Sequence, residues 1–344
     1  MRRTIDLLLT FALSAVGGFV ALLLGVPVGL LAGGALAVSI ATLAGFRTSV
    51  PIRVRDAIFV LVGLSMGASV APDSLSLMVQ WPVTLIALVL ELVAVVLVIG
   101  LVLRKFFGLD RGTAYLSSFP GHLSMVMALA AGGVGDARQI IVIQVTRVMM
   151  LTLVVPLGAL LIAHPTPVTT APEVMSVTEL ALIGAGCALT GWVFARLNVP
   201  AAYVLGSMAF ATIAKLAGLY DGALHPWLVN VTLVAIGAVV GSRFAGLTRA
   251  ELARAAWAGL LSTILTIGIV TLIALGAAQL VDMPFGQIWI GLSPGALEAM
   301  GALGVALGYD TAFIAAHQVA RLLLLGFGIP LVVFLVRRSE PKPS

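Results

Sequence analysis

Four charged side chains lie within long apolar stretches of this 344-residue chain, and they are the first candidates for chemistry: Glu91, Arg147, Glu298 and Arg321. A charged side chain inside a bilayer is costly unless it is paired or hydrated, so it usually marks a pathway for an ion or a substrate. Two arginines predict a clamp for an anion, and a buried carboxylate predicts a site where H⁺ or Na⁺ couples to transport. We therefore expect Arg147 and Arg321 to bind an anionic substrate, with Glu91 or Glu298 as the ion-coupling residue.

Each of these residues also has a structural explanation. The arginines would then form ion pairs with Asp136, Asp310 or Glu298, and Glu91 would be a protonated carboxyl or a salt-bridge partner. Asp136 and Asp310 precede apolar segments, a position that favours capping of a helix N-terminus. At the level of sequence both explanations stay open.

Two Pro-Gly pairs, Pro120-Gly121 and Pro294-Gly295, interrupt apolar segments. Proline removes a backbone donor and glycine permits a sharp change of direction, so each pair predicts a broken helix. Broken backbone at membrane depth occurs only where protein or a water-filled cavity surrounds it, and a helix that restarts there offers unpaired N–H groups to an anion. The other predicted substrate-binding residues flank these breaks or lie one turn from the arginines: Ser117, Ser118, His122, Gln144, Ser293, His317 and Gln318. The alternative is a plain kinked helix with serine caps.

The chain is duplicated at an offset of 174 residues, which aligns both Pro-Gly pairs, Gln144 with Gln318, and Arg147 with Arg321. The glycines of Gly63-x-x-x-Gly67 and Gly237-x-x-x-Gly241 also align and predict close helix packing. Each half holds six apolar segments, expected at 6–24, 27–45, 57–71, 82–103, 113–134 and 139–163, and at 177–195, 199–217, 227–243, 256–280, 286–307 and 312–336. The predicted divisions are a first membrane repeat (1–163), an extended extracytoplasmic linker (164–176) and a second membrane repeat (177–344).

The composition excludes several classes of protein. Hydrophobic residues make up 61% of the chain and charged residues 10%, against roughly 45–50% and about 25% in soluble domains. Such a chain is neither soluble nor disordered, and with Cys187 as its one cysteine it is not a disulfide scaffold. The net charge of +5 is scattered between apolar stretches, which argues against nucleic-acid binding. An all-α polytopic membrane protein remains, with room for about ten to twelve spans of roughly 20 residues.

The basic residues predict how the segments cross the membrane, because cytoplasmic loops carry an excess of Lys and Arg. If the fifth, Pro-Gly segment of each half enters and leaves on one side, the basic loops and both termini become cytoplasmic and the linker becomes external. Five crossings per half then give the halves opposite orientations, which is the inverted-repeat plan of many secondary transporters. We expect the protein to lie in a bacterial inner (plasma) membrane. Whether the Pro-Gly segment is re-entrant or a full-length broken helix stays open. Lys215, which lies beside an external loop, is the one exception to the predicted distribution of basic residues.

An enzyme is the weakest expectation. Four histidines are scattered without ligand spacing, and the sequence contains no Walker loop, Ser-His-Asp set or cysteine cluster. We expect no catalytic residues, no cofactor and no metal, although a metal site built from distant histidines stays open.

The sequences around the breaks resemble the AbrB-type duplicated membrane proteins: Ser-Phe-Pro-Gly-His is followed by Gln144-x-x-Arg147, and Ser-Pro-Gly-Ala-Leu-Glu by Gln318-x-x-Arg321. The resemblance covers nearly the whole chain and both copies. This family is distinct from the soluble DNA-binding regulators of the same name, and its members also carry the labels ammonia monooxygenase and regulator of gene expression. More distantly it resembles the superfamily of cation–proton antiporters and anion symporters, which implies inverted repeats and broken helices but no particular substrate.

Together these features predict a secondary transporter of a small, carboxylate-like organic anion, coupled to H⁺ or Na⁺, with its site between the two broken helices. Its partners would be the lipid bilayer, the anion and the coupling ion, with no nucleic acid, while a homodimer stays open. The alternative is a membrane sensor that regulates gene expression through a protein partner. A metal-dependent membrane monooxygenase is the third hypothesis.

Overall fold

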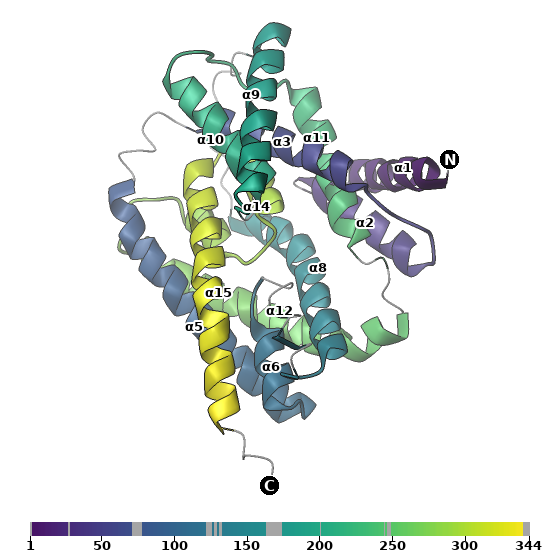
Figure 1. The fold of residues 1–344 in the computed structure, drawn as a ribbon, viewed down its shortest axis with the longest axis vertical. Helices are drawn as coiled ribbons and strands as arrows, with labels where there is room; N and C mark the ends of the chain where they lie inside the picture. The colour runs from purple at the N-terminus through teal and green to yellow at the C-terminus, as the bar shows by residue number, and fades with distance from the viewer. Residues whose placement is uncertain are drawn as a thin grey trace. The chain divides into compact units, whose positions relative to one another are not determined.

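The structure is a computed structural model that describes residues 2–26, 28–70, 78–121, 126, 129–130, 133–162, 174–199, 201–243, 245 and 249–339. In these ranges the regular elements are helices, with one isolated bridge between Val174 and Ala223 (Figure 1). The first half contains α1 (Arg2–Leu23), α2 (Gly29–Leu43), α3 (Ile52–Ala68), the short 3₁₀ helix η1 (Met78–Gln80), α5 (Trp81–Phe107), α6 (Arg111–Ser118) and α8 (Ala137–Ile162). The second half contains α9 (Val177–Arg196), α10 (Ala202–Leu216), α11 (Pro226–Ser242), α12 (Arg249–Ala278), α13 (Phe285–Leu292), α14 (Leu297–Leu307) and α15 (Thr311–Ser339).

The helices confirm the predicted segments, including the interruption of the fifth one. In the second half α13 ends at Leu292 and α14 begins at Leu297, so the Pro-Gly pair lies between two helices. In the first half α6 ends at Ser118, just before the pair. Three predicted starts were wrong: α1 begins four residues early, at Arg2, α3 five residues early, at Ile52, and α12 seven residues early, at Arg249. All three early turns contain arginines, which are good helix formers although they end an apolar stretch.

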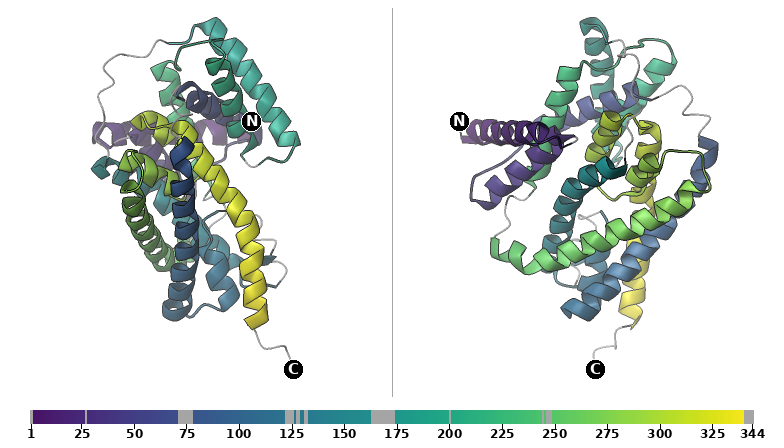
Figure 2. Two further views of the ribbon diagram at one scale, coloured as in Figure 1. Left: turned by 90° about the vertical axis from the view of Figure 1, so that its left-hand side faces the viewer. Right: turned by 180° about the vertical axis from the view of Figure 1, so that it is seen from behind.

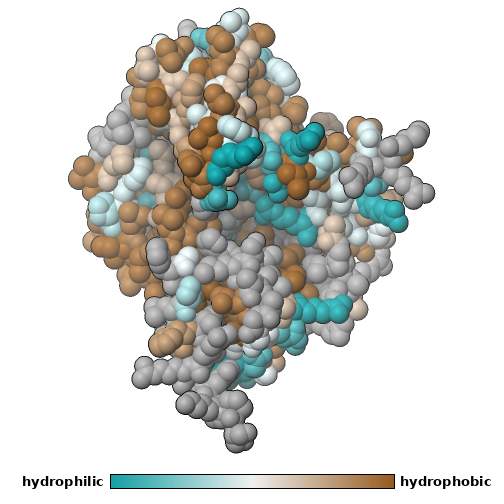
Figure 3. All heavy atoms as spheres, in the orientation of Figure 1, coloured by the Kyte–Doolittle hydropathy of each residue, from teal (hydrophilic) through white to brown (hydrophobic). Residues whose placement is uncertain are grey.

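Five helices in the described part of the chain are long and apolar enough to cross a membrane: Thr4–Leu23, Met78–Phe107, Val177–Arg196, Trp257–Ala278 and Thr311–Pro330. Shorter apolar helices lie at Gly29–Leu43, Ala202–Leu216, Pro226–Ser242 and Leu297–Leu307. Large hydrophobic side chains stay exposed, such as Leu8, Phe19 and Leu23 of α1, and hydrophobic residues cover much of the surface in view in Figure 3. Such helices and surfaces are those of a multi-pass membrane protein, in which lipid covers the apolar exterior.

The chain forms two compact units, and each one combines segments from both halves of the sequence. The first unit comprises Met1–Val79, Thr152–Gly246 and Ala296–Ala316. In it the third helix of each half packs on the second helix of the other half, α3 on α10 and α11 on α2. A Cβ added to Gly63 would lie 2.3 Å from the Val204 carbonyl oxygen, and one added to Gly241 would lie 2.7 Å from that of Ala35. These distances confirm the glycine pairs as close-packing positions.

Lys215, the exception to the predicted charge pattern, has a specific partner in this unit. Its Nζ donates a hydrogen bond to the carbonyl of Ala68, the last residue of α3. A cation at a helix C-terminus meets both an unpaired carbonyl and the negative end of the helix dipole. The position of Lys215 therefore has a structural cause that is independent of the orientation of the loops.

The second unit comprises Gln80–Leu151, Leu247–Gly295 and His317–Ser344. Its frame is the fourth helix of each half, α5 and α12, which pack on each other and carry α6 and α13. Figure 2 shows α5, α12 and α15 as long continuous helices. The predicted boundaries of the sequence repeat stay predictions, and residues 163–173 of the linker lie outside the described residues.

Candidate functional site

The first break is held by side chains of α8. Helix α6 begins at the N-cap Asp110, whose carboxylate accepts from the Thr113 N–H, and it ends before Pro120. Gln144 Nε2 donates to the Leu116 carbonyl at 2.8 Å. Arg147 donates through Nη1 to the carbonyls of Ser117 and Ser118, at 3.2 and 2.8 Å, and through Nη2 to that of Phe119.

These contacts supply hydrogen-bond donors to backbone carbonyls at the end of a helix. The last four carbonyls of a helix have no partner within the helix, and a buried carbonyl without a donor costs free energy. Residues 116–118 end α6 and Phe119 is its C-cap, and all four of their carbonyls receive a donor from Gln144 or Arg147. The Gln-x-x-Arg sequence thus acts as a C-terminal cap of the broken helix.

The second break repeats this arrangement with α15. Gln318 Nε2 donates to the Ser293 carbonyl at 3.0 Å and lies 3.5 Å from the carbonyl oxygens of Ile290 and Gly291. Arg321 Nη2 donates to the Leu292 carbonyl. Residues 290–293 are offset by 174 from residues 116–119, so the same four backbone positions are capped in both halves.

Arg321 has a second partner that Arg147 lacks. Its Nη1 lies 3.1 Å from the Glu91 carboxylate on α5, and both side chains are almost completely buried. Arg147 lies within range of the charges of Glu91 and Arg321, but no carboxylate of the described residues pairs with it directly. The position offset by 174 from Glu91 is Leu265, which packs against an apolar cluster. The second unit therefore buries two guanidinium groups and one carboxylate among its described residues.

One turn before Arg321, His317 adds a buried polar contact with α5. A ring nitrogen, Nε2, lies 2.8 Å from the Thr84 hydroxyl, and the ring meets the edge of Trp81 at a centroid distance of 6.3 Å. Thr84 and Glu91 are two turns apart on one face of α5. His317 and Arg321 thus contact the same helix face through two separate polar pairs.

Several buried donors at the breaks remain unused. Arg147 Nε, Arg321 Nε and the Ser117 hydroxyl have no hydrogen-bond partner among the described residues. The other two predicted serines bond to their own helices, Ser118 to the Tyr115 carbonyl and Ser293 to that of Trp289, both at 2.7 Å. The first break itself lies close to α15, because a Cβ added to Gly121 (φ 121°) would lie 3.5 Å from Leu325, one turn beyond Arg321.

Other predicted residues have different surroundings. Glu298 belongs to the first unit, where it pairs with Arg243. Asp136 and Asp310 cap helices as expected, since Asp136 accepts from the Arg138 N–H at 2.8 Å and Asp310 from the Ala312 N–H at 2.9 Å. The ion pairs considered for the arginines with these three acids were therefore wrong. His122 lies outside the described residues.

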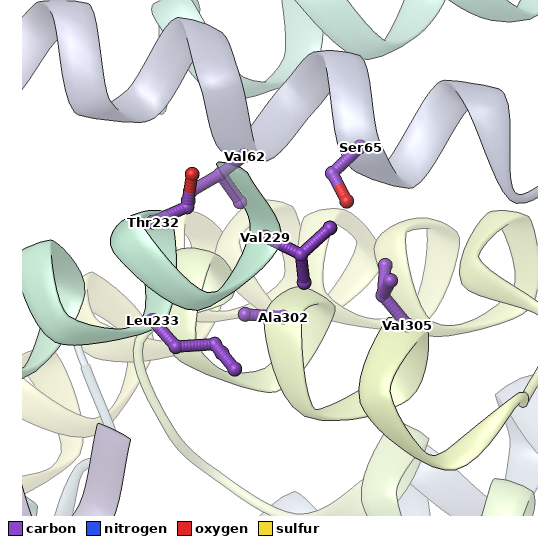
Figure 4. Close-up of a pocket in the computed structure, with 7 residues that line it drawn as sticks. All are labelled: Val62, Ser65, Val229, Thr232, Leu233, Ala302 and Val305. Atoms are coloured by element: carbon purple, nitrogen blue, oxygen red, sulfur yellow. The ribbon is translucent and has the colours of Figure 1, made fainter. Parts of the chain in front are cut away.

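The pocket in Figure 4 lies in the first unit and has a different chemistry. It is lined by Val62, Ser65, Val229, Thr232, Leu233, Ala302 and Val305, and the side chains in the close-up are aliphatic apart from two hydroxyls. The Thr232 hydroxyl donates to the Leu228 carbonyl of its own helix. Since this lining offers an anion no cation, the pocket is not our candidate site. Among the described residues there is no group of three or more His, Cys, Asp or Glu that could hold a metal ion.

Sequence reasoning missed the Glu91–Arg321 pair, the Thr84–His317 contact and the carbonyl partners of the two Gln-x-x-Arg sequences. A usable signal was present in the sequence. Each Gln-x-x-Arg follows a Pro-Gly break after the same number of residues, which suggests a common partner in the break. The seven-residue spacing of Thr84 and Glu91 likewise indicates one helix face.

This architecture defines a class: a multi-pass helical protein with two broken helices, each capped by buried Gln and Arg side chains. Comparison with known families then identifies the lineage. The family described as "Transition state regulatory protein AbrB" matches residues 30–337, and the chain belongs to this family. It is also 24% identical, over 352 aligned residues, to "Uncharacterized protein YhjN" of Bacillus subtilis (strain 168), covering 91% of this chain and 88% of that protein. The resemblance noted in the sequence is thereby confirmed.

Proposed function

We propose that this protein is a secondary transporter of a small, carboxylate-like organic anion, with its site at the two breaks of the second unit. The observation that carries the proposal is the pair of buried arginines whose Nε–H donors have no partner among the described residues. A buried donor without an acceptor is unfavourable, and a carboxylate is the acceptor that a guanidinium binds best. The Ser117 hydroxyl is a third unused donor beside the first break.

The charge balance supports the same ligand class. Two guanidinium groups and one carboxylate leave a surplus positive charge in a buried region. A buried charge without a counter-ion is costly, so an anion that enters this region gains more than a neutral molecule would.

Coupling to H⁺ or Na⁺ through Glu91 is part of the proposal. Of the two ions H⁺ fits the geometry better, because Na⁺ would have to approach a carboxylate that already lies 3.1 Å from the Arg321 guanidinium. A proton needs no additional ligands. Glu298 is the second candidate for coupling, and its partner is Arg243.

We also propose the inverted arrangement of the two halves, with cytoplasmic termini, in a bacterial inner membrane. The support is the distribution of basic residues, together with the structural cause found for the exception, Lys215. Reporter fusions in the linker at 164–176 test it, since an inverted arrangement requires an external linker. A cytoplasmic reporter signal there would refute this orientation.

The transport proposal is tested with purified protein in proteoliposomes. A thermal-shift screen of small carboxylates first finds a ligand, and uptake of that ligand is then measured for the wild type, Arg147→Gln and Arg321→Gln. We expect both variants to lose at least about tenfold in uptake, whereas Asp56→Asn, which removes a carboxylate paired with the adjacent Arg55, leaves uptake unchanged. Unchanged uptake in both arginine variants would refute the proposed site.

The family is described as a regulatory protein, which favours a second candidate function, that of a membrane sensor that signals to a partner. The two functions make different predictions for the same preparation. A sensor would bind its ligand and form a stable complex with a soluble regulator, but it would give no flux in liposomes.

A further inference from the structure

We propose that the buried charges at the two breaks select the valence of the anion, so that the site prefers a monocarboxylate and Glu91 excludes the second charge of a dicarboxylate. This inference rests on the proposed function, because it requires an anion to bind at this site. It goes further by assigning one negative charge to the substrate and a specificity role to Glu91.

The number of buried charges sets the preferred valence. The buried charged side chains in the described part of the second unit are Glu91, Arg147 and Arg321, which together carry one net positive charge. One negative charge on a ligand neutralises this set, and a second one reverses its sign. Since a net charge is costly in a region of low dielectric constant, the neutral combination is preferred.

Groups on the neighbouring helices do not alter this count. Glu91 pairs with Arg321 of α15 and lies within range of the charge of Arg147 of α8, while His317 of α15 contacts Thr84 of α5. Residues 257–278 of α12, and all of α13, contain no Asp, Glu, Lys, Arg or His. Tyr115 of α6 lies beside Gly100, more than two turns from Glu91.

One carboxylate group has enough acceptor positions for the three buried polar atoms that have no partner. Both Nη atoms of Arg147 and Nη2 of Arg321 bind backbone carbonyls, and Arg321 Nη1 binds Glu91. The two Nε atoms and the Ser117 hydroxyl have no hydrogen-bond partner among the described residues, and a carboxylate accepts about four hydrogen bonds. A second carboxylate on the same molecule would instead experience repulsion from Glu91.

The test compares mono- and dicarboxylates of equal carbon number by titration calorimetry on the purified full-length protein near pH 8. Suitable pairs are propionate with malonate, butyrate with succinate, and hexanoate with adipate. We expect the wild type to bind the monocarboxylate of a pair at least about tenfold more tightly than the dicarboxylate. In Glu91→Gln the net charge of the buried side chains rises by one, so the affinity for the dicarboxylate should rise by about ten- to a hundredfold relative to the affinity for the monocarboxylate of the same pair. Asp56→Asn is the matched control and should keep the wild-type ratio.

Arg147→Gln supplies an independent test if Glu91→Gln does not fold. It removes the net positive charge, so both ligands should bind more weakly and the dicarboxylate should gain nothing. A wild-type preference for dicarboxylates, an unchanged ratio in Glu91→Gln, or tighter dicarboxylate binding in Arg147→Gln would overturn the valence assignment, even if carboxylate uptake itself is observed. If no pair binds and no carboxylate is taken up, the proposed function fails and the valence assignment fails with it.

Discussion

Replacing Arg147 by methionine tests the role of this residue as the cap of the first broken helix. Methionine keeps the length and burial of the side chain but removes the donors for the carbonyls of Ser117, Ser118 and Phe119. A buried polar group left without a partner costs about 1–3 kcal/mol, so three of them cost roughly 3–9 kcal/mol. Removing a buried cation that has no direct carboxylate partner offsets part of this cost. We therefore expect a net loss of about 2–5 kcal/mol in the free energy of unfolding.

The assay is unfolding of the purified protein in mixed micelles with increasing SDS, combined with hydrogen exchange of the α6 amides. Arg147→Lys is the comparison, because it keeps the charge but replaces a planar fork of donors by a single ammonium group. We expect the lysine variant to lose less free energy of unfolding than the methionine variant, and α6 to exchange faster in both. A methionine variant within about 0.5 kcal/mol of the wild type, with unchanged exchange in α6, would show that the carbonyls do not depend on Arg147.

Two further predictions concern the first unit. Gly241→Leu should prevent stable folding, because even its Cβ would lie 2.6 Å from the Cβ of Val38. Gly184→Ala is the control and should be tolerated, because no atom lies within 4 Å of a Cβ added there. Monodispersity of each purified variant in size-exclusion chromatography is the measurement. Lys215→Met should cost about 1–2 kcal/mol in the same SDS titration, because the Ala68 carbonyl loses its donor. An unchanged midpoint for Lys215→Met would mean that water replaces the lysine at the end of α3.

The order of the helices and the positions of both breaks could be predicted from sequence, because they depend on local properties. Apolar length predicts where a helix runs, and Pro-Gly predicts where it stops. The starts of α3 and α12 were misplaced because hydropathy falls at the first arginine although the helix has already begun. The division into two units was not predictable, since one apolar segment resembles another and hydropathy does not say which helices pack together.

The site was predictable in its members but not in its contacts. Arg147, Arg321, Gln144 and Gln318 are recognisable because polar residues are rare in apolar segments and these recur at one offset. Their partners are backbone carbonyls, which carry no side-chain signature in a sequence. Glu91 and Arg321 are 230 positions apart, so their pairing depends on how α15 packs against α5.

The two halves share the caps of their broken helices but differ in the polar contacts around them, and this difference bears on ligand binding. The cap of each broken helix is present twice, because each break leaves its own carbonyls without donors. The polar contacts between α5 and α15 are present once.

At the positions offset by 174, Thr84 and His317 are replaced by Ala258 and Ile143, which lie in one apolar cluster, and Leu265, in place of Glu91, packs against it. A purely structural duplication would have no reason to keep a buried ion pair in one copy and aliphatic packing in the other, since both copies cap their helices equally well. The proposed anion site depends on the surplus positive charge that follows from this asymmetry. A glutamate in place of Leu265 should neutralise that charge. We expect Leu265→Glu to abolish carboxylate binding while Leu265→Gln retains it, and equal binding by the two variants in calorimetry would refute the charge argument.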